Sequence, residues 1–167
     1  MNDSESAGGT ARRLHALLHR HGVLLVHHRR IPGSRTSIDH IAIGRGGVTV
    51  IDAKRARGRV RVRRASGSSG EPRERLLIGG REETKLVEGV CRQVAVVSEL
   101  LGGSVAVIGA MCFVESGGLP IFSSPTLDGV RIGGLRGIAR LARRDGPHTP
   151  SEMHEISERL RASLPEA

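Results

Sequence analysis

The chain has 167 residues, 38% of them hydrophobic and 1% aromatic, and its formal net charge is +9. This length suits one domain, and its core must be aliphatic because the chain has two Phe and no Trp or Tyr. The shortage of aromatic rings excludes base stacking as the main mode of nucleic-acid binding, so phosphate contacts must supply any such affinity.

Basic residues are concentrated in the first part of the chain. Residues 1–64 hold 14 Lys or Arg against 4 Asp or Glu, whereas residues 65–167 hold 12 against 13. A strongly basic half predicts a polyanionic partner, and a solubilising surface is the alternative. Among the 26 cations only Lys54 and Lys85 are lysines. A compact ammonium and a planar guanidinium are not interchangeable in a crowded site, which draws attention to Lys54.

The remaining composition argues against several other classes of protein. Cys91 and Cys112 have neither metal-ligand spacing nor a disulfide pattern, and we expect two buried thiols. No secretory signal and no run of about 20 apolar residues is present, which favours a cytoplasmic protein without membrane contact. The histidines between positions 15 and 28 have no paired spacing with a Cys or His on a later helix, which argues against a zinc site.

The first elements follow from apolar spacing and from Gly and Pro positions. Residues 1–9 are polar and Gly-rich, and we predict that they are disordered. Leu14, Leu17 and Leu18 have helical spacing, which predicts a helix over 11–21 with Thr10 as its cap. A flexible loop is expected over 65–73. Strands are predicted at 23–31, 37–43, 48–54, 58–64 and 75–78, with a turn at Gly46-Gly47.

The second half predicts a crossover helix and a buried strand. An apolar stripe indicates a helix over 82–101, and the continuous apolar run 104–114 is typical of a central strand. A short strand at 129–132 and helices at 135–144 and 151–164 complete the chain. This order predicts an α/β fold, in which a mixed sheet is flanked by helices. We divide the chain into a core at 10–134 and a C-terminal helical segment at 135–167.

Three polar side chains interrupt the second and third predicted strands. Asp39 lies near the start of one strand, and Asp52 and Lys54 lie at the end of the next. Asp52 and Lys54 share a face about 6.6 Å apart, and a hairpin places Asp39 opposite Asp52. Two carboxylates and the backbone carbonyl of Ala53 are the hard oxygen ligands that Mg²⁺ prefers. An exposed Asp52–Lys54 ion pair without a metal is the alternative.

Five arginines follow Lys54 with a period of two. In a strand they would form a basic ribbon that holds a phosphate backbone beside the carboxylates. A solvated edge strand, charged against aggregation, is the alternative. The residues are Arg55, Arg57, Arg59, Arg61 and Arg63.

These motifs resemble the nuclease-related domain, a branch of the PD-(D/E)xK nuclease superfamily. The Ile-Asp-His-Ile run at 38–41, the Gly-Val-x-Val-Ile-Asp-x-Lys run at 47–54 and Gly58 match its pattern in order and spacing. The resemblance covers about residues 10–115. It implies a restriction-endonuclease-like core and hydrolysis of phosphodiester bonds in DNA.

The resemblance also implies roles for individual residues. Asp39 and Asp52 would bind Mg²⁺ or Mn²⁺, Lys54 would be catalytic, and Gln93 would face the site from the helix over 82–101. The family often has a Glu in its first helix, whereas residues 10–21 contain no acid, and Glu5 lies just upstream. Two other hypotheses therefore stay open: an inactive nucleic-acid-binding module, and a regulatory domain whose helical tail recruits another protein.

Overall fold

The computed structural model describes residues 3–66, 72–114 and 125–167. The helices in these ranges are α1 (Asp3–Leu18), η1 (a 3-10 helix, His19–His21), α2 (Lys85–Leu100), α3 (Leu135–Ala142) and α4 (Pro150–Ser163). The strands are β1 (Leu24–Arg30), β2 (Ser37–Gly44), β3 (Gly47–Arg55), β4 (Val60–Ser66), β5 (Pro72–Ile78), β6 (Arg81–Glu82), β7 (Val107–Val114), β8 (Thr126–Leu127) and β9 (Val130–Gly134).

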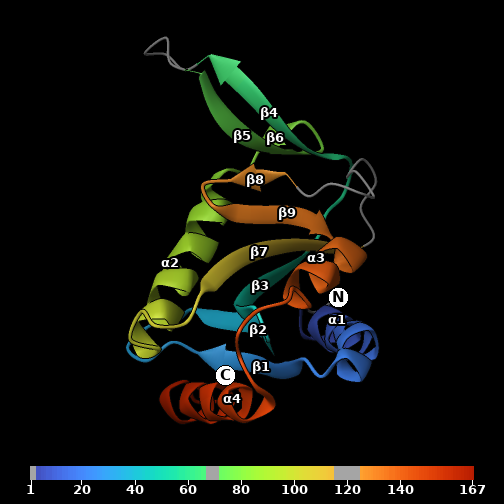
Figure 1. Ribbon diagram of the computed structural model, residues 1–167. Helices are drawn as coiled ribbons and strands as arrows, with labels where there is room; N and C mark the ends of the chain where they lie inside the picture. Colours follow the sequence, from blue (N-terminus) through green and yellow to red (C-terminus); the bar gives the residue numbers. More distant parts are fainter. Residues whose placement is uncertain (1–2, 67–71, 115–124) are drawn as a thin grey trace.

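The main sheet is mixed, with strand order β1-β2-β3-β7-β9-β8. The first three strands form an antiparallel meander, and β3, β7 and β9 run parallel to one another. The apolar run that predicted a central strand is β7, which lies between β3 and β9 (Figure 1). The predicted α/β class is confirmed, and the arrangement is consistent with a restriction-endonuclease-like core.

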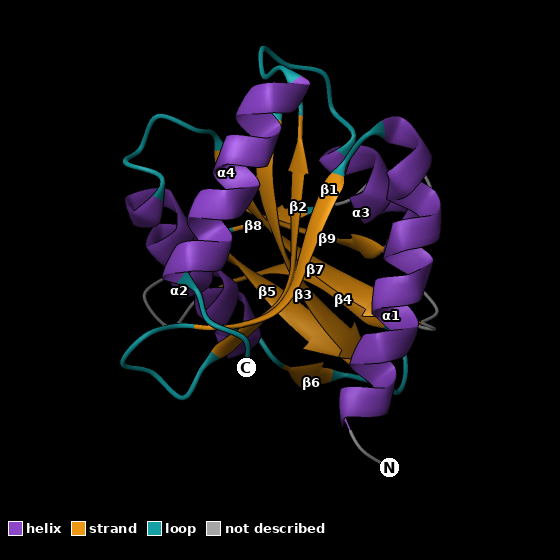
Figure 2. Ribbon diagram, turned by 90° about the horizontal axis from the view of Figure 1, so that it is seen from below, coloured by secondary structure: helices purple, strands orange, loops and turns teal. Residues whose placement is uncertain are grey.

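Helices cover both faces of the main sheet (Figure 2). Val48 and Val50 of β3 share a buried cluster with Val97 of α2 and with α4, whereas Ile51 packs with α1 and α3. This division follows from the alternation of side chains along a strand. None of the helices in the described ranges is long and apolar enough to cross a membrane.

The predicted strand at 58–64 is β4, and it lies outside the main sheet. Residues 56–59 form an irregular connection in which Gly58 adopts a φ of +100°. The chain then enters a separate sheet of β4, β5 and β6, which projects beyond β8 (Figure 1). The predicted loop over 65–73 is shortened, because β4 extends to Ser66 and β5 begins at Pro72; residues 67–71 lie outside the described part.

The beginning of the chain also differs from the sequence-based prediction. Helix α1 starts at Asp3, so residues 3–9 are helical rather than disordered, while residues 1–2 lie outside the described part. Thr10 is buried within this helix and does not cap it. Packing of Leu14 and Leu18 against the sheet stabilises the C-terminal half of this helix.

The two cysteines are free thiols, and only one is buried. Burial raises the pKa of the Cys112 thiol to about 12, which keeps it protonated in the core of the main sheet. Cys91 on α2 is partly exposed, and its Sγ–H donates to the carbonyl of Asp128 at 3.6 Å.

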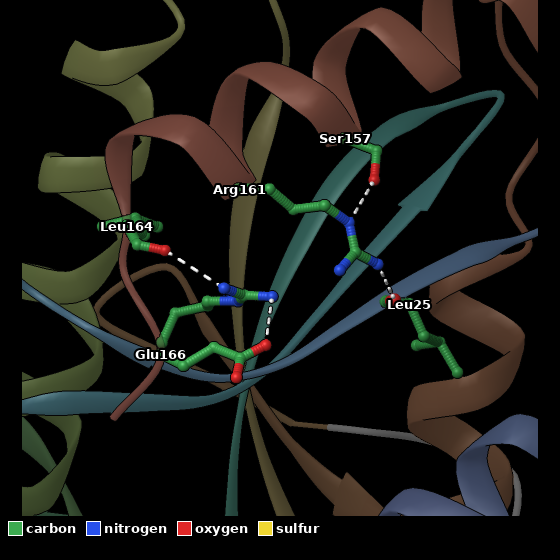
Figure 3. Close-up of polar contacts among 6 residues, drawn as sticks. Leu25, Ser157, Arg161, Leu164 and Glu166 are labelled. Carbon is green, nitrogen blue, oxygen red and sulfur yellow. Dashed lines mark hydrogen bonds and ion pairs between the residues drawn. The ribbon is translucent and has the colours of Figure 1, made fainter.

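The C-terminal helical segment packs on the main sheet. Met153, Ile156 and Leu160 of α4 join the cluster of β1 and β2, and Ile138 of α3 packs on the opposite face. Arg161 bonds the carbonyl of Leu25, as Figure 3 shows. After α4 the chain pairs with β1 through an Arg29–Glu166 bridge, and buried Arg29 donates to the carbonyl of Leu164 at 3.4 Å (Figure 3).

Because α4 belongs to the core, its N-terminal cap should affect global stability. Thr149 accepts from the Glu152 N–H, and the Glu152 carboxylate accepts from the Thr149 N–H. We expect Thr149→Ala to lower the free energy of unfolding by about 1 kcal/mol. Urea unfolding followed by circular dichroism measures it, with exposed Ser151→Ala as the control that should change little. Equal stability of the two variants would contradict the cap.

Candidate active site

The β2–β3 hairpin brings the two predicted carboxylates together. Its pairing runs from Gly44 opposite Gly47 to His40 opposite Ile51, and one further step in this register brings Asp39 opposite Asp52. A two-residue turn joins the strands, and loop length sets the register of a hairpin. The two acidic residues thus occupy facing positions where the two strands begin to separate.

The side chain of Asp39 accepts a backbone hydrogen bond from the neighbouring strand β3. Its Oδ2 accepts the Ala53 N–H at 2.9 Å. Burial raises the pKa of the Asp39 carboxyl, and the charge of Asp52 also raises it, while the Ala53 N–H, Lys54 and His28 act in the opposite direction. Burial and the charge of Asp52 therefore disfavour the ionised form of Asp39, and a cation between the two carboxylates would stabilise that form.

Asp52 and Lys54 lie on the face of β3 that packs against α2. Val48 and Val50 show this orientation through their contacts with α2, and the alternation of a strand extends it to Asp52 and Lys54. Lys54 Nζ lies 2.9 Å from Asp52 Oδ1. Asp52 is 8% exposed and the Lys54 side chain is 38% exposed, so the pair has one buried and one partly exposed member.

Gln93 of α2 reaches the same end of the hairpin. It is buried, and its Nε2 donates to the carbonyl of Ser37 at 3.0 Å, two residues before Asp39. A carbonyl can only accept, so this bond fixes which end of the amide is the nitrogen. Gln93 Oε1 is buried without a partner among the described residues. Such an oxygen can accept from a water or from a hydrated ion.

Three histidines lie next to Asp39 in the sequence or the register of β1 and β2. His28 lies opposite Asp39 in the β1–β2 register, and its φ of +47° is unusual for a residue with a side chain. His40 is fully buried and shares a hydrogen bond with His27. Burial, together with the charges of His27 and His28, lowers the pKa of His40 to about 3, so this side chain is neutral and structural.

The positive φ of His28 predicts that glycine is more stabilising than alanine at this position, which is the reverse of the usual order in a strand. The left-handed region costs a residue with a Cβ about 1–2 kcal/mol, and glycine avoids this cost. We expect His28→Gly to be more stable than His28→Ala by about 1 kcal/mol in urea unfolding. At His27, which has ordinary strand geometry, alanine should be the more stable. If alanine were the more stable substitution at both positions, the backbone strain assigned to His28 would be contradicted.

The predicted arginine ribbon is divided between different elements. Arg55 ends β3, Arg57 and Arg59 lie in the irregular connection, and Arg61 and Arg63 lie on β4. The condition for a continuous ribbon, one strand through all five residues, is not met, because the chain leaves the main sheet at residues 56–59. All five side chains are nevertheless exposed, so an exposed series of basic residues follows Lys54 along the chain.

The donor set fits a divalent ion that keeps several waters. Asp39 Oδ1, Asp52 Oδ2 and the carbonyl of Ala53 are candidate ligands, and Mg²⁺ is commonly held by one or two carboxylates. Within the described ranges, no three His, Cys, Asp or Glu side chains gather at one point. Glu5, the possible substitute for the first-helix acid, lies in α1, and its side chain is outside the described part.

The sequence alone did not single out two groups of residues near this site. The place of His28 opposite Asp39 depends on the β1 register and on a positive φ, neither of which has a sequence signal. Arg73 and Arg75 lie beside the β4 arginines because β5 pairs with β4. Their period of two was a signal of this arrangement.

Comparison with protein families gives one finding. The family model described as nuclease-related domain matches residues 6–114. The match begins one residue after Glu5, includes Asp39, Asp52, Lys54 and Gln93, and ends with β7. No curated protein and no solved structure matches the chain.

Proposed function

This chain belongs to the nuclease-related domain family, and we propose that it is a metal-dependent nuclease that hydrolyses phosphodiester bonds of DNA. The observation that carries this proposal is the facing position of Asp39 and Asp52, with Lys54 Nζ at 2.9 Å from Asp52. Two carboxylates and an ammonium at the end of a hairpin are suited to binding a metal and a phosphate group together.

Asp39, Asp52 and the carbonyl of Ala53 would hold Mg²⁺ or Mn²⁺. A bound divalent ion lowers the pKa of a water ligand and offsets charge on the phosphate. The raised pKa of Asp39 supports this assignment, because burial and the nearby Asp52 charge disfavour two ionised carboxylates without a cation. Removal of divalent ions with a chelator should therefore abolish cleavage.

Lys54 would act on the scissile phosphate or on the attacking water. Its partly exposed ammonium can donate to a phosphate oxygen and stabilise the charge that develops there. Gln93 would position this site, since its bond to the carbonyl of Ser37 ties α2 to the strand that carries Asp39. Arg55, Arg57 and Arg59 would contact phosphates next to the site, and Arg61 and Arg63 would contact phosphates farther along.

An inactive DNA-binding module is the second candidate function. The family often has a Glu in its first helix. The family model matches from residue 6, and residues 6–18 contain no acid, because Glu5 lies just before the match. This lack of an acid favours the binding module. In this case the arginines would still bind the phosphate backbone, and the affinity would fall steeply with salt.

Cleavage of labelled DNA separates the two functions. Linear, circular and single-stranded DNA would be incubated with Mg²⁺, with Mn²⁺ and with a chelator, using the wild-type protein and Asp52→Asn. We expect metal-dependent products that Asp52→Asn fails to form, while both proteins bind DNA. Salt-sensitive binding without cleavage under any condition would reject the nuclease and support the binding module. Parallel labelled RNA tests the choice of DNA.

A further inference from the structure

The small sheet of β4, β5 and β6 has one face against the core and one face exposed. Val60 and Leu76 are buried in a cluster with α2, β7 and β9, and Val62 and Ile78 pack against that cluster. The residues that alternate with them point to the outside. We call four of these outward residues the hairpin arginine face: Arg61 and Arg63 of β4, and Arg73 and Arg75 of the paired strand β5.

The charges on this face are not balanced within the small sheet. Arg63 lies directly opposite Arg75, and like charges in such a pair destabilise a sheet. Arg61 faces Leu77, and Arg73 faces Ala65, so neither has an acid opposite it. Glu82 of β6 pairs with Arg75 at 2.8 Å. Glu82 thus offsets the charge of Arg75, whereas Arg61, Arg63 and Arg73 have no acid opposite them in the β4–β5 register. The resulting excess of positive charge is suited to an anionic partner that crosses both strands.

The position of the hairpin arginine face connects it to the candidate active site. β3 ends at Arg55, the exposed Arg57 and Arg59 follow, and β4 begins at Val60. The hairpin then extends away from the main sheet on the side opposite α4 (Figure 1). A basic path thus leads from Lys54 along the connection to both strands of the hairpin.

We propose that the hairpin arginine face binds the phosphate backbone of double-stranded nucleic acid that extends beyond the candidate active site. This proposal rests on the proposed function in taking the bound polymer to be the substrate. Planar guanidinium groups can bind phosphates with two donors each, and arginine is the residue best suited to this contact. The shortage of aromatic rings excludes a stacking platform for single strands.

The length of the hairpin sets the length of polymer that it can contact. The four arginines lie between Arg61 and the position of Ala65, which is opposite Arg73, and these four steps span about 13 Å at the usual rise per residue. A duplex carries one charge per about 1.7 Å of its axis, or about 3.4 Å per base pair, so the face covers about four base pairs. Affinity should therefore rise when a duplex is lengthened by about four base pairs beyond the segment held at the site.

Fluorescence anisotropy with labelled DNA duplexes of 8 and 20 base pairs tests the proposal, in a buffer with chelator so that no cleavage occurs. The variant is Arg63→Gln/Arg73→Gln, which leaves the Arg75–Glu82 pair intact. Its matched control is Arg136→Gln/Arg140→Gln, which removes the same charge from two exposed positions on α3. Both variants should keep the wild-type melting temperature, because the substituted side chains are exposed.

We expect the hairpin variant to bind the long duplex at least tenfold more weakly than wild type and the short duplex almost normally. Its slope of log affinity against log salt should fall by about 1.8, as for two lost phosphate contacts. The α3 control should retain the wild-type slope. Equal losses in the two variants, or no loss in the hairpin variant, would overturn the proposal.

The alternative partner and the nuclease proposal are tested separately. If the hairpin substitutions removed binding to anionic phosphatidylserine vesicles and left DNA binding intact, the face would bind a membrane surface and the inference would be wrong. Because the binding assay needs no metal, DNA binding through this face can hold even if cleavage is absent. If cleavage rates depended neither on duplex length nor on these arginines, the inference about the hairpin would be rejected and the nuclease proposal would stand.

Discussion

Lys54→Arg is expected to lower kcat for DNA cleavage by about 10²–10³-fold, although the substitution keeps the positive charge. Lys54 Nζ lies 2.9 Å from the buried carboxylate of Asp52, and Lys54 is paired in register with Phe113 of β7. A guanidinium is wider and planar, and it spreads its charge over a fork of donors where the ammonium concentrates its charge on one atom. The chain uses arginine for 24 of its 26 cations, so a site that needs only charge would tolerate arginine.

Single-turnover cleavage at saturating DNA measures this effect and separates chemistry from binding. Lys85→Arg provides the matched control, because Lys85 is the other lysine and is exposed at the start of α2. The control should cleave at the wild-type rate. Full activity of Lys54→Arg would show that position 54 supplies charge alone, and the catalytic role assigned to the ammonium would be withdrawn.

Gly47→Ala is expected to lower the free energy of unfolding by about 3 kcal/mol or more, through backbone strain and overpacking together. Gly47 has a φ of +110°, and an added Cβ would overlap the carbonyl oxygen of Ala106. That carbonyl accepts the Val48 N–H at 2.9 Å, next to the first pairing of β3 with β7. The substitution must therefore disturb the start of β3 as well as the turn that sets its register.

Chemical denaturation measures the loss, and Gly33→Ala is the control for backbone strain alone. Gly33 has a φ of +73° with no neighbour near an added Cβ, so its cost should be about 1 kcal/mol. Because the hairpin register places Asp39 opposite Asp52, we also expect weaker cleavage by any Gly47→Ala protein that still folds. Equal stability losses in the two variants would show that β3 can shift away from Ala106.

The hairpin that carries the candidate site could be predicted from local sequence. Alternating β-branched residues marked both strands, and the glycines marked the turn between them. The predicted turn was one residue too late, because Arg45 and Gly46 form the turn and Gly47 begins β3. A two-residue turn at Gly46-Gly47 would have paired Asp39 with Lys54, whereas the observed register leads to Asp39 opposite Asp52. The apolar run of β7 identified the central strand for a similar reason, since such a strand is buried on both faces.

The division of the arginines between two sheets could not be predicted from their spacing. A period of two is compatible with a continuous strand and also with a strand that is broken and resumed. Gly58, with its φ of +100°, interrupts the strand, and the apolar partners of Val60 come from α2, β7 and β9. Burial of Val60 and Leu76 against these distant residues determines where the hairpin lies.

By itself, the sequence determined the mixed α/β class, the hairpin and the three polar side chains at its end, because these depend on periodicity and short turns. Only the tertiary structure decided the positions of His28, Gln93 and the hairpin arginine face around or beyond that end. Each depends on contacts between segments far apart in the chain, such as the Gln93–Ser37 bond and the pairing of β4 with β5. Such contacts depend on how whole elements pack, and local residue patterns do not specify that packing.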